Sequence, residues 1–189
     1  MPRFKMKVRG LKTTIQRMRR TNRNVNTAVA LGTEASAKVI AETARAMAPL
    51  DEGPLEEAIK HTFKKTPSGY RAEIFVDPAA ETVQSGKTVS VFAYAEYQHE
   101  NLVVGGGETA AGSGKLNLGP RSREKQEHSA PGIDVGGKFM DRALDLRGRP
   151  LVAEMDKVVR QAVRSDRRPN ASRLSGFNDL VRNLLGNRI

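Results

Sequence analysis

The apolar positions between residues 24 and 55 recur at steps of three and four, which is the period of one face of an α-helix. Pro49 ends this pattern because it disfavours helical geometry at Ala48 and has no backbone donor. Gly32 costs about 1 kcal/mol relative to alanine inside a helix, so it marks either a kink or a close helix contact. We therefore predict one long helix followed by an acidic turn. Its apolar face comprises Val25, Ala28, Val29, Ala35, Val39, Ile40, Ala44 and Met47.

The residues before this helix predict separate short elements. Residues 4 to 9 alternate between apolar and basic side chains, as in a short strand. Residues 11 to 20 carry apolar side chains at steps of four and three, which predicts a short amphipathic helix with a basic outer face. The polar residues 21 to 24 predict a link, in which Asn24 or Asn26 is the candidate N-cap of the long helix. The apolar residues of the short helix are Leu11, Ile15 and Met18.

Three segments after the acidic turn show the two-residue alternation of β-strands. Residues 58 to 65 predict a first strand, and a turn at Pro67 connects it to a clearer second strand over residues 70 to 76. Residues 89 to 96 alternate again, with aromatic side chains on one face, and predict a third strand. We expect an α+β fold in which the long helix packs on a small antiparallel sheet of three to four strands.

The second half of the chain contains a long glycine-rich segment and two helical patterns. Residues 101 to 137 lack periodicity, which predicts a long loop that is disordered or that orders against a partner. Helical spacing then resumes and continues to residue 163, with Pro150 well placed in a first turn. A short amphipathic helix ends the chain, and its apolar side chains are a candidate interface. These are Phe177, Leu180, Val181 and Leu184.

These patterns divide the chain into three parts. Residues 1–23 form a basic N-terminal arm with a short helix, residues 24–163 an α+β core domain that includes the long loop, and residues 164–189 a C-terminal extension.

The 189 residues include no cysteine, which excludes disulfides and thiolate metal sites. No apolar run approaches the roughly 20 residues needed to cross a bilayer, and no signal-peptide core follows the basic start. We expect a protein made and used inside a cell, or built into something assembled there.

The positive charge is concentrated at the N-terminus. Nine of the Lys and Arg residues and no acid lie in residues 1–23, so this part supplies nine of the eleven net charges. Such a segment indicates a polyanionic partner, either nucleic acid or an acidic protein surface, unless it is simply a solvated terminus. It lacks stacking aromatics and a groove-reading module, so any DNA contact is expected to be with phosphates and independent of sequence. The candidate contact residues are Arg17, Arg19, Arg20 and Arg23.

Several sequence patterns resemble catalytic or ligand-binding motifs, but none meets the requirements of such a site. Residues 107 to 115 contain a Gly-Lys pair but lack the first glycine and the following hydroxyl of a Walker loop. Acids around Pro54 fit the start of a helix, where the dipole favours them. We expect no enzymatic activity, no metal and no cofactor. The residues weighed were the carboxylates Asp51, Glu52, Glu56, Glu57, Glu96 and Glu100, and the histidines His61, His99 and His128.

Four short motifs follow one another in a characteristic order. They are Val8-Arg9-Gly10-Leu11, Ala46-Met47-Ala48-Pro49-Leu50-Asp51-Glu52-Gly53-Pro54-Leu55, Tyr94-Ala95-Glu96-Tyr97 and Lys138-Phe139-Met140-Asp141-Arg142-Ala143-Leu144. In this order the chain resembles the tail-component or tail-completion family of long-tailed, lambdoid-type phages, small virion proteins at the junction of head and tail. The match extends over residues 8 to about 163.

The resemblance implies a non-enzymatic structural protein with an α+β fold. It implies a homo-oligomeric ring, assembled in the host cytoplasm, that joins portal-side and tail-side proteins around the DNA channel of the virion. A strongly cationic channel would hold phosphates and slow DNA ejection, so we expect an acidic neighbouring protein as the main partner of the basic arm, with non-specific contact to packaged DNA as the lesser one. The alternatives are a tail-terminator ring and a sequence-independent basic DNA-binding protein.

Overall fold

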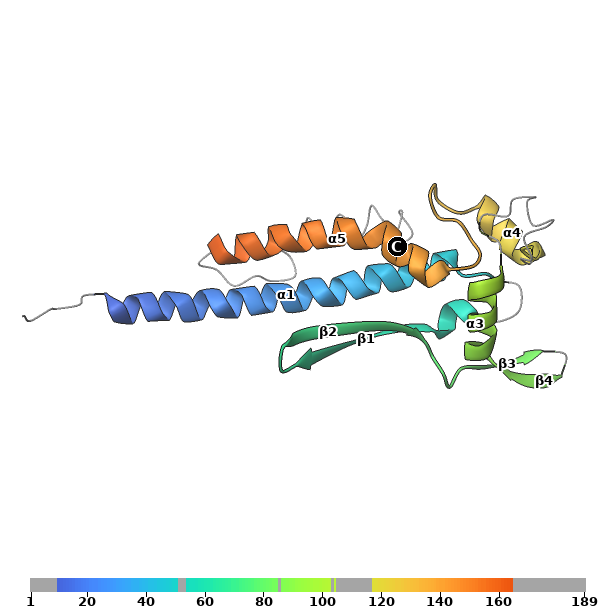
Figure 1. Ribbon diagram of the computed structural model, residues 1–189, viewed down its shortest axis with the longest axis horizontal. Helices are drawn as coiled ribbons and strands as arrows, with labels where there is room; N and C mark the ends of the chain where they lie inside the picture. The colour runs from blue at the N-terminus through green and yellow to red at the C-terminus, as the bar shows by residue number, and fades with distance from the viewer. Residues whose placement is uncertain (1–9, 51–53, 85, 103, 105–116, 165–189) are drawn as a thin grey trace, which may run out of the picture.

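The computed structural model describes residues 10–50, 54–84, 86–102, 104 and 117–164. Its elements confirm the predicted α+β class, with a long N-terminal helix, four short antiparallel strands and C-terminal helices (Figure 1). Along the chain they are α1 (Leu11–Met47), α2 (Leu55–Ala58), β1 (Ile59–Thr66), β2 (Gly69–Val76), β3 (Glu81–Gln84), β4 (Lys87–Ser90), α3 (Val91–Asn101), α4 (Pro120–Glu127) and α5 (Phe139–Arg164).

The helix α1 is continuous over 37 residues. The prediction of a short helix, a polar link and a separate long helix is therefore wrong. Polar residues lower the helix propensity of positions 21 to 24 but do not forbid helical geometry, unlike proline. Asn24 is not an N-cap but is buried within the helix, 3% exposed. The helix ends as predicted before Pro49, and the backbone N–H of Ala48 donates to the carbonyl of Ala44 at 2.9 Å.

Two layers cover α1. The helix α5 packs along one side and the β1–β2 hairpin lies on the other (Figure 1). Against α5 the buried side chains are Ala28 and Val39 from α1, and Leu151, Val158 and Ala162 from α5. A second cluster joins the C-terminal end of α1 to α2, the hairpin, α3 and the start of α5 through Met47, Leu55, Ile59, Val76, Val91 and Phe139. Small residues on α1 permit this close packing on both sides.

The helix α5 begins earlier than its proline suggests. Pro150 lies inside α5 and not in its first turn, which corrects our prediction for this segment. Its side chain is exposed, so the ring does not disturb the buried contacts with α1. Of the two alternatives for Gly32, the structure has the close contact, because Met155 of α5 lies directly against it.

The first predicted hairpin is confirmed, and the third predicted strand is not. The strands β1 and β2 pair in register from Ile59 with Val76 to Thr66 with Gly69. The strands β3 and β4 form a second, separate two-stranded sheet. The segment predicted as a strand over residues 89 to 96 instead leaves β4 at Ser90 and continues as α3.

The segment predicted as a long loop contains a helix. The helix α4 lies within residues 101 to 137 and packs over the C-terminal end of α1, where Ser122 accepts a hydrogen bond from the backbone of Leu50 at 2.8 Å. The glycine-rich residues 105–116 and the C-terminal residues 165–189 lie outside the described residues. The candidate interface Phe177, Leu180, Val181 and Leu184 therefore lies outside them too.

Candidate functional site

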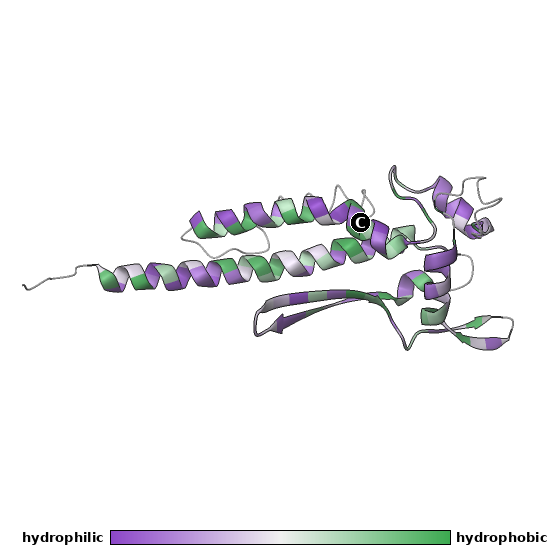
Figure 2. Cartoon of the chain, in the orientation of Figure 1, coloured by the Kyte–Doolittle hydropathy of each residue, from purple (hydrophilic) through white to green (hydrophobic). Residues whose placement is uncertain are grey.

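The N-terminal turns of α1 project beyond the end of α5 (Figure 1). We call residues 11–23 the α1 tip. Its apolar side chains are uncovered, since Leu11 is 59%, Ile15 41% and Met18 67% exposed. At 100° per residue these three side chains fall on one face of α1, in line with Val25 and the buried stripe farther along the helix. Apolar colouring accordingly continues along α1 to its projecting end (Figure 2).

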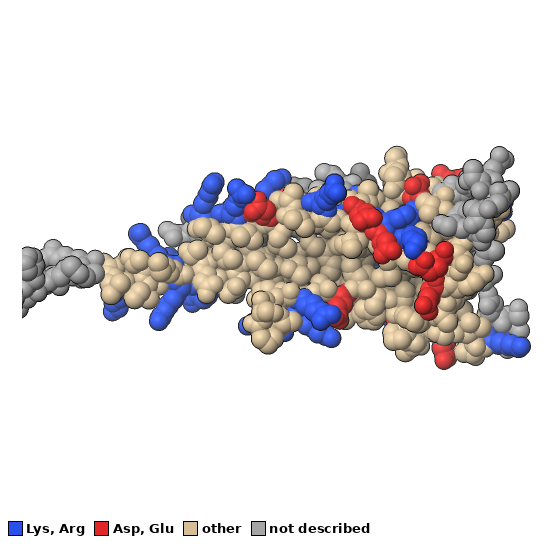
Figure 3. All heavy atoms as spheres, viewed as in Figure 1, with Lys and Arg blue, Asp and Glu red and all other residues tan. Residues whose placement is uncertain are grey.

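Basic side chains surround this apolar stripe. The helical period places Arg17 on one side of the stripe and Arg19 on the other. Lys12, Arg20 and Arg23 occupy the remaining surface, and all five are exposed. Residues 11–23 contain no acid. Lys and Arg side chains accordingly surround the projecting end of α1 in the space-filling view, whereas the visible Asp and Glu side chains lie over the rest of the molecule (Figure 3).

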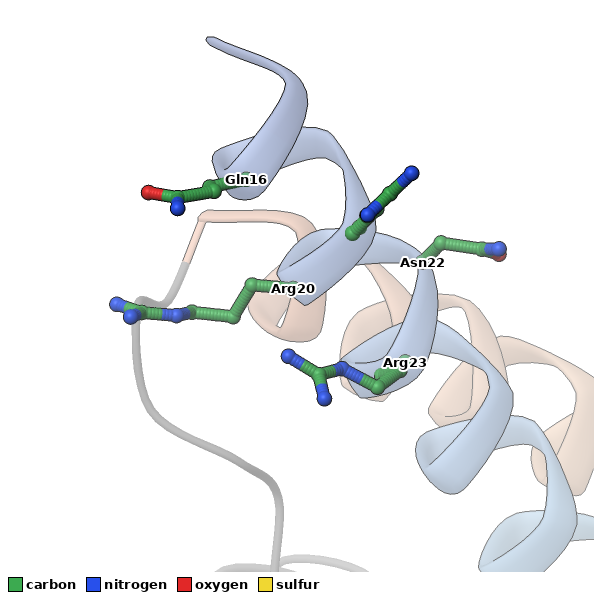
Figure 4. Close-up of a pocket in the computed structure, with 5 residues that line it drawn as sticks. Gln16, Arg20, Asn22 and Arg23 are labelled. Carbon is green, nitrogen blue, oxygen red and sulfur yellow. The ribbon is translucent and has the colours of Figure 1, made fainter. Parts of the chain in front are cut away.

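The structure brings three of the four predicted arginines to one surface of the α1 tip, and Arg17 lies elsewhere on the helix. An open hollow on the tip is lined by Gln16, Arg19, Arg20, Asn22 and Arg23. Arg20 extends to the same side as Gln16, while Asn22 extends to the opposite side (Figure 4). A site for one phosphate needs several donors directed at the same position. The basic side chains of the α1 tip are instead spread around the helix and form a positive surface.

One member of the predicted acidic cluster after α1, Glu56, has a structural role. Glu56 forms an ion pair with Lys125 of α4, and Lys125 Nζ also donates to the carbonyl oxygens of Arg45 at 2.8 Å and Ala48 at 2.7 Å. These carbonyls belong to the end of α1, where no further turn supplies donors. Burial lowers the pKa of Lys125, and the ion pair with Glu56 opposes this effect. Asp51 and Glu52 lie outside the described residues.

The second acidic cluster forms an ion-pair network at the surface. Lys138 Nζ donates to Glu100 Oε2 at 2.9 Å, and His99 Nδ1 lies 2.9 Å from Glu100 Oε1. The hydrogen bond from Lys138, followed by that from His99, holds the pKa of Glu100 below its ordinary value. The ring of His99 stands edge-on to Phe139, with centroids 5.2 Å apart. This network fixes the end of α3 to the start of α5.

Sequence reasoning missed a cleft beside this network. It has a volume of about 350 Å³ and lies between β2, α3 and the first turn of α5. We call it the α3/α5 cleft. Most of its lining is apolar, and the exposed residues Glu96 and Asp141 also line it. The steps of four and three between Phe92, Glu96 and His99 would have indicated one helix face, had this segment been interpreted as helical. The apolar lining consists of Phe75, Val76, Phe92, Ala95, Phe139 and Met140.

The described residues offer no cluster of three or more His, Asp or Glu side chains that could hold a metal ion. Residues 107–115, which contain the Gly-Lys pair, lie outside the described part. Among the helices of that part, none has the length and apolar character to cross a bilayer.

Comparisons with protein-family models, with curated proteins and with solved structures each find no match.

Proposed function

We propose that the protein is a structural virion component of a tailed phage that completes the tail or joins it to the head. In this role it forms a homo-oligomeric ring that connects portal-side and tail-side proteins around the DNA channel. The order of motifs from Val8-Arg9-Gly10-Leu11 to the segment 138–144 supports this assignment.

The α1 tip is the observation that carries the assembly role. It presents three exposed apolar side chains on a helix that is otherwise packed on two sides. Covering such a stripe gains about 25 cal/mol per Å² of apolar surface removed from water, so the tip favours association with another protein surface. The flanking arginines favour a partner surface that is acidic.

The decisive experiment is a null mutation in the phage that encodes this chain. Loss of the protein is expected to leave filled heads and finished tails unattached in electron micrographs. Supplying the intact gene in trans is the matched control and restores joined particles. Tails of uncontrolled length would assign the chain to the tail-terminator ring, and normal virions would refute a role in assembly.

A sequence-independent DNA-binding protein is the second candidate, favoured by the exposed arginines of the α1 tip. It predicts that the purified protein binds unrelated DNA fragments equally and that affinity falls steeply with salt. Neutralising Arg17, Arg19, Arg20 and Arg23 together would abolish binding.

A further inference from the structure

We propose that the α1 tip of one copy docks in the α3/α5 cleft of the next copy, so that subunits associate head to tail. The inference rests on the self-assembly that the proposed function requires, and it names the two surfaces that meet. Neither apolar surface is covered by other residues in the described part of its own chain. The two surfaces are complementary in both apolar character and charge.

The apolar parts of the two surfaces match. The tip carries Leu11, Ile15 and Met18 in one stripe, and the cleft offers an aromatic lining that includes Phe92, itself 47% exposed. Flexible methionine and leucine side chains adapt well to aromatic surfaces. Burial of these groups against each other removes exposed apolar surface at both ends of the molecule.

The charges beside these apolar parts also match. Arg17 and Arg19 flank the stripe on the tip, and Glu96 and Asp141 line the cleft. Three basic side chains lie near these acids. Lys138 is paired with Glu100, the Arg142 guanidinium turns inward to the carbonyl of Gly137 at 2.9 Å, and His99 Nε2 lies 3.8 Å from Asp141 Oδ2, too far for a hydrogen bond. Glu96 is exposed and the Asp141 side chain is 66% exposed, so both carboxylates are accessible to an incoming basic helix.

The geometry requires the contact to be between molecules. The tip and the cleft lie at opposite ends of the structure (Figure 1). They are separated by most of the length of α1, roughly 50 Å at 1.5 Å per residue, and a continuous helix cannot fold back on itself. Because the two surfaces differ, the contact is heterologous, and a heterologous contact closes into a ring when its rotation permits.

Single cysteines test this contact directly, because the chain has none of its own. The full-length variants Met18→Cys and Phe92→Cys are mixed and treated with a short bis-maleimide. A cross-linked dimer is expected in the mixture and not in either variant alone. Replacing Met18→Cys by Val152→Cys, at an exposed position on α5, is the matched control and should give no product. Cross-linking of Met18→Cys to itself, or no product in the mixture, would overturn the head-to-tail contact.

Charge reversal provides an independent readout. Arg17→Glu with Arg19→Glu, or Glu96→Lys with Asp141→Lys, should each weaken self-association by about tenfold or more, and a mixture of the two variants should restore it. Circular dichroism verifies that these surface variants fold. Oligomers that respond to neither set of changes would refute this interface and leave the proposed function standing. A wild-type protein that stays monomeric at every concentration and with its neck partners would refute both.

Discussion

Met155 of α5 lies so close to Gly32 of α1 that a Cβ atom on Gly32 would stand 2.5 Å from the Met155 terminal methyl group and would also overlap its sulfur. The glycine thus makes room for a side chain from the facing helix. This contact sets the separation of α1 and α5 midway along their common length.

A double-mutant cycle tests this contact. In the wild-type background, Gly32→Ala should change the free energy of unfolding by less than about 1 kcal/mol, since improved helix propensity offsets the displacement of Met155. In a Met155→Ala background the same substitution should stabilise by about 0.5–1 kcal/mol, because the overlap is gone. Urea denaturation measures all four proteins. Equal effects in both backgrounds would show that the two residues do not interact.

Lys125 is expected to stabilise the end of α1 to which it donates. Lys125→Met keeps the aliphatic packing but leaves the carbonyls of Arg45 and Ala48 without this donor, and should lower the free energy of unfolding by about 1–3 kcal/mol. The matched control is Lys157→Met, because Lys157 is exposed and forms an ion pair with Glu154 at the surface. It should cost less than about 0.5 kcal/mol. Equal losses from the two substitutions would refute this capping role.

Pro150 is expected to weaken α5. It supplies no N–H to the carbonyl of Leu146, one turn earlier in the helix. Pro150→Ala should therefore raise the midpoint of thermal unfolding, with a gain of about 1–3 kcal/mol. Arg149→Ala, at the neighbouring exposed position, is the control and should change little. A loss of stability would indicate that the packing of α5 on α1 depends on the proline.

The pKa of Glu100 should respond to its partner Lys138. Its pKa is lowered in the folded protein, so its contribution to stability is present above its ordinary value of 4.5 and is lost as pH falls through the folded value. Lys138→Met should move this pKa upward, towards 4.5. An NMR titration of the Glu100 carboxyl carbon measures the shift, with Lys157→Met as a variant that should leave it unchanged. An unchanged value in Lys138→Met would contradict the ion pair.

Self-association should depend on salt. The proposed contact pairs arginines with carboxylates at a solvent-accessible rim, and at 1 M ionic strength the screening length falls to about 3 Å. Sedimentation at increasing sodium chloride should show weaker association. Variants that lack the tip charges should lose most of this dependence. Association that strengthens with salt would indicate an interface dominated by apolar burial.

The sequence predicted elements well where period and chain breakers agreed. The β1–β2 hairpin, the end of α1 before Pro49 and the helix start at Leu55 follow the predictions. The break predicted at residues 21–24 rested on polarity alone, and polarity does not end a helix when Asn24 packs inside the fold. The segment 89–96 fits a two-residue period, yet the helix α3 that begins within it buries Val91, Ala95 and Gln98, which are spaced by four and three.

Of the two surfaces in the proposed contact, the sequence predicted the α1 tip but not the α3/α5 cleft. The basic residues of the α1 tip were visible in the sequence because they lie close together along the chain. The cleft joins β2, α3 and α5, and these come together only in the fold. Lys125 was also hidden, because it lies in the segment predicted as a loop and reaches a helix end about 80 residues away in the chain.

The α1 tip is a short lever that extends from a packed helix. Ala28 of α1 is buried against α5, so the free part of the helix is residues 11–23, about 20 Å long at 1.5 Å per residue. A bend of about 5° where this part begins displaces Leu11 by about 2 Å, less than half the pitch of one helical turn. The packing of α1 against α5 therefore fixes where the tip engages its neighbour.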